Sequence, residues 1–135
     1  MALFLAIACA AGPGGGVSVT DAWVRPTTGA DLSTAAYLTI ANTTGQADAL
    51  LSVSSPAATS VEMHLTSMDS MGMTGMQPIS RIDVAAGATT TLEPGRMHLM
   101  VMGLGKALAV GDRIELDLVF EHAGRVVVEA EVRQG

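Results

Sequence analysis

Short segments that alternate apolar and polar residues run along the chain from Val17 onward, separated by clusters of turn-forming residues. The clearest example is Ile114, Leu116, Leu118 and Phe120, which recur at every second position. A period of two is typical of a strand with one buried face, and short strands with frequent turns are typical of a β-sandwich or small barrel. We therefore predict a single all-β domain with strands at Val17–Val24, Ala35–Ala41, Ala49–Ser54, Ser60–Thr66, Ile79–Val84, Thr89–Leu92, His98–Met102, Arg113–Phe120 and Val126–Val132.

The segment Ser67–Pro78 does not follow this alternation. It reads SMDSMGMTGMQP and places methionines among serine, glycine, threonine and aspartate. Gly72 and Gly75 disfavour a helix, because glycine loses more conformational freedom on ordering than other residues. We predict a loop here, and its methionines are Met68, Met71, Met73 and Met76.

The predicted strand around His98 carries different chemistry on its two faces. Because side chains alternate along a strand, Leu99 and Val101 share one face, and His98, Met100 and Met102 share the other. The first face is suited to the core. The second presents an imidazole beside thioethers, so a His-x-Met pair on a strand is a simple way to hold two soft ligands together.

Ser60–Thr66 offers a further ligand by the same reasoning. Glu62 and His64 share a face of this predicted strand, so His64 is a candidate third ligand. Glu62 either orients the imidazole of His64 or is simply exposed, since metal-bound histidines commonly donate their second N–H to a carboxylate or carbonyl. The following segment brings Met76 into consideration as the fourth ligand.

The concentration of methionine favours copper among the metals. Eight of the nine methionines lie between Met63 and Met102, and thioether sulfur is a soft ligand that prefers Cu(I), to which imidazole also binds. Methionine also fills gaps in protein cores, and we expect that packing role for Met63, Met97 and Met102. For Met68, Met71 and Met73 we expect no defined role, with alternate copper contacts as the lesser alternative. His122 lies in a predicted turn, where we expect a surface residue.

Composition excludes several classes of function. The net charge is −6, with 7 basic and 13 acidic residues, and the arginines are scattered, so we expect no nucleic-acid partner. Cys9 is the single cysteine. The domain therefore lacks the thiolate that a blue-copper centre requires and has no Cys-x-x-Cys motif. No nucleophile-elbow motif is present, and we do not expect an enzyme.

The first residues resemble an export signal. Residues 1–11 read MALFLAIACAA and precede a glycine-rich stretch; this apolar run is too short to span a bilayer as a helix. Two interpretations remain open: a cleaved signal peptide, or a leader in which Cys9 becomes the lipidated first residue. Either one exports the domain, so we assign residues 1–16 to a leader with a glycine-rich tether and residues 17–135 to a copper-binding β domain outside the cytoplasm.

The spacing of the four candidate ligands, His64–x11–Met76–x21–His98–x–Met100, resembles the signature of the periplasmic copper chaperones of the PCu(A)C family, also known as DUF461. The flanking segments DAWVR, AAYLTIAN, VEMH and LEPGRMHLM also resemble that family, and together the likeness extends over roughly residues 17–132. The family often has methionine directly after its first histidine, where this chain has Leu65.

This resemblance implies a cupredoxin-like Greek-key β fold and a Cu(I) site made by His64, Met76, His98 and Met100. It also implies an extracytoplasmic chaperone that delivers copper to the CuA centre of cytochrome c oxidase, directly or with Sco-type proteins. We expect a monomer. The competing hypothesis is a metal-free, immunoglobulin-like surface module that binds other proteins, since the β pattern and the export signal fit it equally well.

Overall fold

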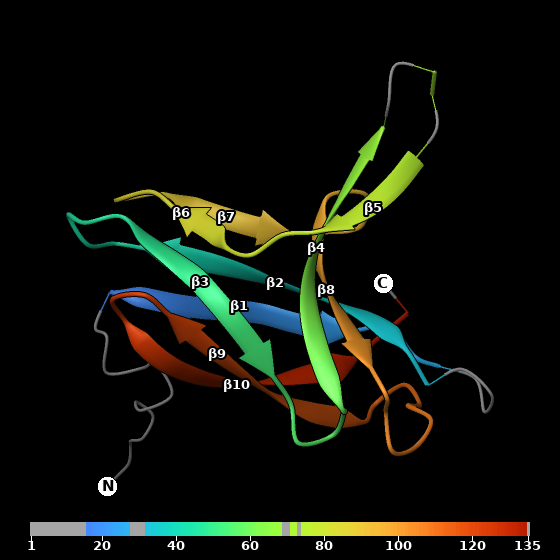
Figure 1. Cartoon of the computed structure of the whole chain (residues 1–135). Helices are drawn as coiled ribbons and strands as arrows, with labels where there is room; N and C mark the ends of the chain where they lie inside the picture. Colours follow the sequence, from blue (N-terminus) through green and yellow to red (C-terminus); the bar gives the residue numbers. More distant parts are fainter. Residues whose placement is uncertain (1–15, 28–31, 69–70, 73, 135) are drawn as a thin grey trace, which may run out of the picture.

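The computed structural model describes residues 16–27, 32–68, 71–72 and 74–134, and every regular element in them is a β-strand (Figure 1). No helix that is long and apolar enough to cross a membrane occurs in these residues. The strands are β1 (Val17–Val24), β2 (Thr34–Asn42), β3 (Asp48–Ser54), β4 (Ser60–Met68), β5 (Thr74–Pro78), β6 (Ile82–Val84), β7 (Thr89–Leu92), β8 (Met97–Met102), β9 (Arg113–Phe120) and β10 (Gly124–Val132). The predicted all-β class is confirmed.

Seven of these strands form a closed barrel. They follow the order β4-β8-β2-β1-β10-β9-β3, and pairing between Val53 of β3 and Val61 of β4 closes the ring. The β1–β10 pair is parallel, and the other pairs are antiparallel. The three remaining strands extend this barrel: β5 pairs with β4, β6 with β3 and β7 with β2. Closure matters because a barrel leaves few unpaired strand edges.

The interior is filled by the aliphatic side chains that the alternation predicts. Leu50, Leu99, Leu116 and Leu118 are completely buried, and they come from β3, β8 and β9. Each fully buried leucine contributes about 1.5–3 kcal/mol relative to an exposed one. With the interior occupied in this way, polar side chains that alternate with the core residues lie on the outer wall.

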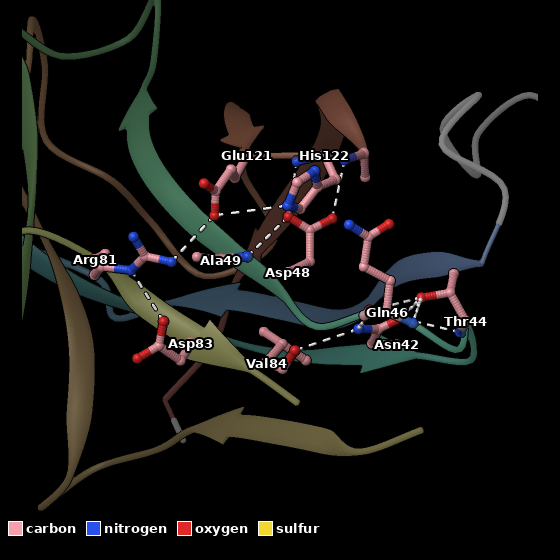
Figure 2. A network of polar contacts seen from close by, with 11 residues as sticks. Asn42, Thr44, Gln46, Asp48, Ala49, Arg81, Asp83, Val84, Glu121 and His122 are labelled. Carbon is pink, nitrogen blue, oxygen red and sulfur yellow. Dashed lines mark hydrogen bonds and ion pairs between the residues drawn. The ribbon is translucent and has the colours of Figure 1, made fainter. Parts of the chain in front are cut away.

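A polar corner forms where β3 begins, next to the turn after β9 (Figure 2). The Asp48 carboxylate accepts backbone hydrogen bonds from Ala49 at 2.8 Å, His122 at 2.9 Å and Ala123 at 2.9 Å. Nearby, the Asn42 side chain donates to the carbonyl of Val84 at 3.2 Å. These bonds join the β9–β10 turn to β3, and β2 to β6. His122 lies in this corner with an exposed side chain, as predicted.

Burial acts to raise the pKa of Asp48. Two effects lower this pKa instead: first the backbone hydrogen bonds from His122, Ala49 and Ala123, and then the charge of His122. The net pKa of Asp48 lies below the usual value of an aspartate. A carboxylate that accepts several backbone N–H groups is stabilised in its charged form. The corner is therefore held together by an ionised Asp48.

The structure corrects the prediction of a loop at Ser67–Pro78. β4 continues to Met68, and Thr74–Pro78 forms β5, which pairs antiparallel with β4. The two strands form a hairpin that projects from the barrel (Figure 1). Glycine and serine disfavour a helix, but they are compatible with a hairpin, and Gly72 has a φ of 82° that suits the turn. Met73 lies outside the described residues.

The strand predicted at Ile79–Val84 is also shorter than expected. Only Ile82–Val84 pairs with β3, whereas Pro78 belongs to β5. Ile79 lies between the two strands and packs partly buried against the core. The apolar residues at both ends of Ile79–Val84 therefore pack against the core. Between them the chain leaves its pairing with β4 and begins to pair with β3.

Candidate metal centre

The register between β4 and β8 brings His64 and His98 together. The two residues are direct partners across the antiparallel pair, and their ring centroids lie 5.6 Å apart. Leu99 and Val101 point into the core, as predicted, so His98 lies on the opposite, outer face of β8. Directly opposed residues project to the same side of a sheet, and His64 therefore shares this outer face.

The same register places the two candidate thioethers on this face. Met100 lies two residues beyond His98 and opposes Glu62 of β4, while Met76 of β5 opposes Thr66 of β4. Since Glu62, His64 and Thr66 alternate with inward residues, all four candidate ligands lie on one outer face of the three strands β5-β4-β8. Met76 is 56% exposed, whereas His98 is only 5% exposed. The arrangement thus has a buried side and an open side.

A tight turn leads the chain into β8. The Arg96 N–H donates to the carbonyl of Glu93 at 3.0 Å, with Pro94 and Gly95 between them. Gly95 has a φ of 86°, and proline followed by a glycine with positive φ is the sequence of a type II turn. The Arg96 carbonyl then accepts hydrogen bonds from the backbone N–H of Thr66 and from a ring nitrogen of His98. This turn fixes the start of the strand that carries His98 and Met100.

The hydrogen bonds of His64 leave one nitrogen unused. Its Nε2 lies 2.9 Å from Oε1 of Glu62, so Glu62 contacts His64, as one of the two sequence interpretations expected. In contrast, Nδ1 of His64 is buried and has no hydrogen-bond partner. Such an atom costs about 1–3 kcal/mol when it is left unsatisfied. A soft metal ion is a suitable partner for it, because the other candidate donors on this face are another imidazole and two thioethers.

The ring of His98 is kept neutral by its surroundings. Burial lowers the pKa of His98 below its usual value; the hydrogen bond to the Arg96 carbonyl opposes this shift, and the neighbouring His64 adds to it. Only a neutral imidazole has a free lone pair for a metal. At neutral pH the side chain of His98 is therefore in the form that binds metal.

Thioethers are essential to any metal site of this kind. Within the part of the chain that the structure describes, no group of three or more His, Cys, Asp or Glu residues is arranged to hold a metal ion. The four-donor set exists only when Met76 and Met100 are counted with His64 and His98. Met71, also on the projecting hairpin, is 85% exposed. Met73 and Cys9, which the sequence also singled out, lie outside the described residues.

Comparison with known proteins identifies the family. A family model described as "Putative lipoprotein LpqE-like" matches residues 17–132. The chain belongs to the LpqE-like family. "Putative lipoprotein Lxx21020" of Leifsonia xyli subsp. xyli is 33% identical over 118 residues, which are 87% of this chain and 70% of that protein.

Solved structures share this fold. The "Copper-bound PCuAC domain from PmoF2" is 25% identical with a TM-score of 0.76, over 90% of the LpqE-like chain and 95% of that domain. The solution structure of "CuI-DR1885" from Deinococcus radiodurans is 32% identical with a TM-score of 0.67, over 84% of this chain and 76% of that one. Their names agree with the PCu(A)C resemblance.

An aromatic row, to which the sequence analysis assigned no role, borders the site of the LpqE-like chain. The ring centroid of Tyr37 lies 6.4 Å from that of His98, and that of Trp23 lies 4.7 Å from that of Tyr37. The Arg25 guanidinium lies over both rings, and its Nε donates to the Tyr37 hydroxyl at 3.3 Å. The row covers one side of the buried His98. The alternation along β2 could have indicated that Tyr37 lies on the outer face, because the neighbouring Leu38 points inward.

Proposed function

We propose that this LpqE-like protein binds one copper ion through His64, Met76, His98 and Met100 and carries it outside the cytoplasm as a metallochaperone. One observation carries the proposal: the strand register gathers two imidazoles and two thioethers on a single outer face. The buried, unpartnered Nδ1 of His64 adds support. So do the structural relatives whose names describe copper-bound domains.

Cu(I) is the oxidation state that suits these ligands. Thioethers are soft and bind the monovalent ion, and no thiolate or carboxylate belongs to the proposed ligand set. Four neutral ligands hold Cu(I) without neutralising its charge. A thiolate acceptor holds Cu(I) and also neutralises its charge, so we expect transfer from this site to thiolate ligands to be downhill.

Met76 is the ligand that we expect to leave first during transfer. It is 56% exposed on the hairpin that projects from the barrel, whereas His98 is held within the wall. An incoming ligand from an acceptor protein can therefore approach from the side of Met76. Replacement of one thioether at a time keeps the ion coordinated throughout the exchange.

The acceptor we propose is the CuA centre of cytochrome c oxidase, reached directly or through a Sco-type assembly protein. The PCu(A)C resemblance of the sequence supports this choice. The lipoprotein descriptions of the family and of the Leifsonia relative support a place outside the cytoplasm. Lipidation of Cys9 would anchor the domain to the membrane, while a cleaved leader would release it as a monomer.

Anaerobic titration with Cu(I) against a chromophoric chelator tests the proposal. We expect the purified chain to bind one equivalent and the His98→Ala/Met100→Ala variant to lose it. The matched control is Met97→Leu, because Met97 is next to His98 but packs against the core on the other face. Absence of binding by the parent chain would overturn the copper proposal and favour the metal-free surface module.

A further inference from the structure

The two histidines of the proposed site make hydrogen bonds through different ring nitrogens. We propose that Glu62 and the Arg96 carbonyl hold His64 and His98 in opposite tautomers, so that copper binds Nδ1 of His64 but Nε2 of His98. Glu62 is then a positioning residue that acts through His64. This inference rests on the proposed copper site, but its first test needs no metal.

For His64, the partner of Nε2 decides the tautomer. An ionised carboxylate can only accept hydrogen bonds, so the 2.9 Å contact with Oε1 of Glu62 requires that Nε2 carry the hydrogen. A neutral imidazole has one N–H. Nδ1 of His64 therefore carries the free lone pair, and this is the atom that the structure buries without a partner.

For His98 the assignment is reversed. Its Nδ1 lies 3.4 Å from the carbonyl oxygen of Arg96, and a carbonyl also only accepts. Nδ1 of His98 therefore donates, and Nε2 carries the lone pair. His98 is only 5% exposed, and its ring is bordered by the rings of His64 and Tyr37, so the ring has little room to turn over.

The difference follows from the reach of the two partners. Glu62 lies two residues before His64 on β4. Arg96 lies two residues before His98, directly ahead of β8. A backbone carbonyl lies close to the strand and reaches Nδ1, the nitrogen nearer to the backbone. A glutamate side chain extends away from the strand and reaches Nε2, the nitrogen at the far end of the ring. The register places the two rings on one face of the sheet.

Glu62 has a second consequence for bound copper. Its carboxylate contacts the far side of the His64 ring, and it is 52% exposed. A carboxylate hydrogen-bonded to a ligating histidine makes the ring a better donor, and its negative charge is favourable near a cation. We therefore expect Glu62 to raise copper affinity without touching the ion.

Nitrogen-15 NMR of the metal-free full chain tests the tautomers directly. Two-bond correlations between ring protons and nitrogens, recorded well above the ordinary histidine pKa of about 6.5, distinguish a protonated nitrogen from a bare one. We expect His64 to be protonated at Nε2 and His98 at Nδ1. Protonation of His64 at Nδ1, or an even mixture of tautomers, would overturn the inference.

Variants of Glu62 separate its positioning role from a general structural one. In Glu62→Ala we expect His64 to become a mixture of tautomers, whereas Glu62→Gln retains a side-chain oxygen that accepts from Nε2 and keeps the tautomer. Glu129→Ala removes another exposed strand carboxylate and should change neither histidine. If Glu62→Ala leaves His64 in its original tautomer, Glu62 does not position the ring.

Copper loading completes the test, because Cu(I) is diamagnetic and the same spectra can be recorded. We expect shifts of Nδ1 in His64 and of Nε2 in His98, and a loss of Cu(I) affinity of about 10- to 100-fold in Glu62→Ala, with a smaller loss in Glu62→Gln. Binding through Nε2 of both rings would overturn this inference and leave the copper site intact. Failure to bind Cu(I) would instead overturn the proposed function, while the spectra of the metal-free chain would still decide the tautomers of His64 and His98.

Discussion

The Asp48 corner and the His64 face are both polar clusters on the same barrel, but their hydrogen bonds are completed to different degrees. At Asp48 the carboxylate accepts three backbone N–H groups. At His64 one buried ring nitrogen has no partner, and Met76 is exposed on the same outer face. A cluster that only holds strands together satisfies its buried atoms internally. A cluster that leaves a buried ring nitrogen without a partner is suited to bind an additional group, such as a metal ion.

The comparison predicts that substitutions in the two clusters have opposite consequences. Changes at the Asp48 corner should lower stability and leave copper binding intact. Replacement of the exposed Met76 on the His64 face should lower copper affinity and leave stability nearly intact, since its side chain is little packed against the barrel. For Asp48→Ala and Met76→Leu, stability and copper binding are therefore both measured on the same variant.

The largest effect is expected for Asp48→Ala. Three backbone N–H groups would lose a charged acceptor, and hydrogen bonds to charged groups contribute about 1.5–3 kcal/mol each but do not add fully. We expect the free energy of unfolding to fall by about 3 kcal/mol in urea denaturation, with the copper stoichiometry unchanged.

The control for Asp48 is Asp83→Ala. Asp83 lies in the same corner and contacts Arg81 at 2.9 Å, but its side chain is 78% exposed. An exposed ion pair contributes little, so this change should stay within about 0.5 kcal/mol. Equal losses in the two variants would show that the corner is stabilised by its overall charge and not by the three backbone bonds of Asp48.

A smaller effect, on binding alone, is expected for Met76→Leu. Leucine has nearly the same volume as methionine but no sulfur, and the position is exposed, so the stability of the barrel should not change. We expect Cu(I) affinity to fall by about tenfold, or 1.4 kcal/mol, and the release of copper to a dithiol acceptor to become faster.

Met71→Leu is the matched control on the same hairpin. Met71 is the more exposed of the two and is not in the proposed ligand set, so its replacement should leave affinity and release unchanged. If Met76→Leu also changes neither, Met76 is not a ligand and the proposed order of ligand exchange is wrong.

Much of the barrel could be predicted from the sequence because its strands have one buried face. The predicted bounds of β1, β7 and β9 match the structure to the residue. Turn residues border these segments, such as Pro94 and Gly95 after β7 and Gly111 before β9. The β4–β5 hairpin was not predicted. It projects from the barrel, so core burial does not impose a regular pattern on it, and its glycines could be read as a loop.

The candidate ligands could be chosen from the sequence, but their arrangement could not. His64 and His98 meet because β4 pairs with β8 in one particular register, and a shift by one residue would move one of them to the other face. That register is decided by packing of the whole barrel. The same holds for Asp48. Its partners His122 and Ala123 are far from it in the sequence, and the sequence shows Asp48 only as a charged residue next to a predicted strand.

The smallest predicted effect concerns acid, and it depends on the lowered pKa of Asp48. A carboxyl whose pKa is lower in the folded than in the unfolded chain stabilises the fold fully above its unfolded pKa of about 3.9. That contribution is lost as pH falls through the folded pKa. We therefore expect the difference in unfolding free energy between the parent chain and Asp48→Asn to be constant near neutral pH and to shrink below about pH 4. Urea denaturation at a series of pH values measures it. A difference that stays constant into strong acid would mean that the Asp48 corner is held by the shape of the side chain and not by its charge, and the contrast with the His64 face would then rest on copper binding alone.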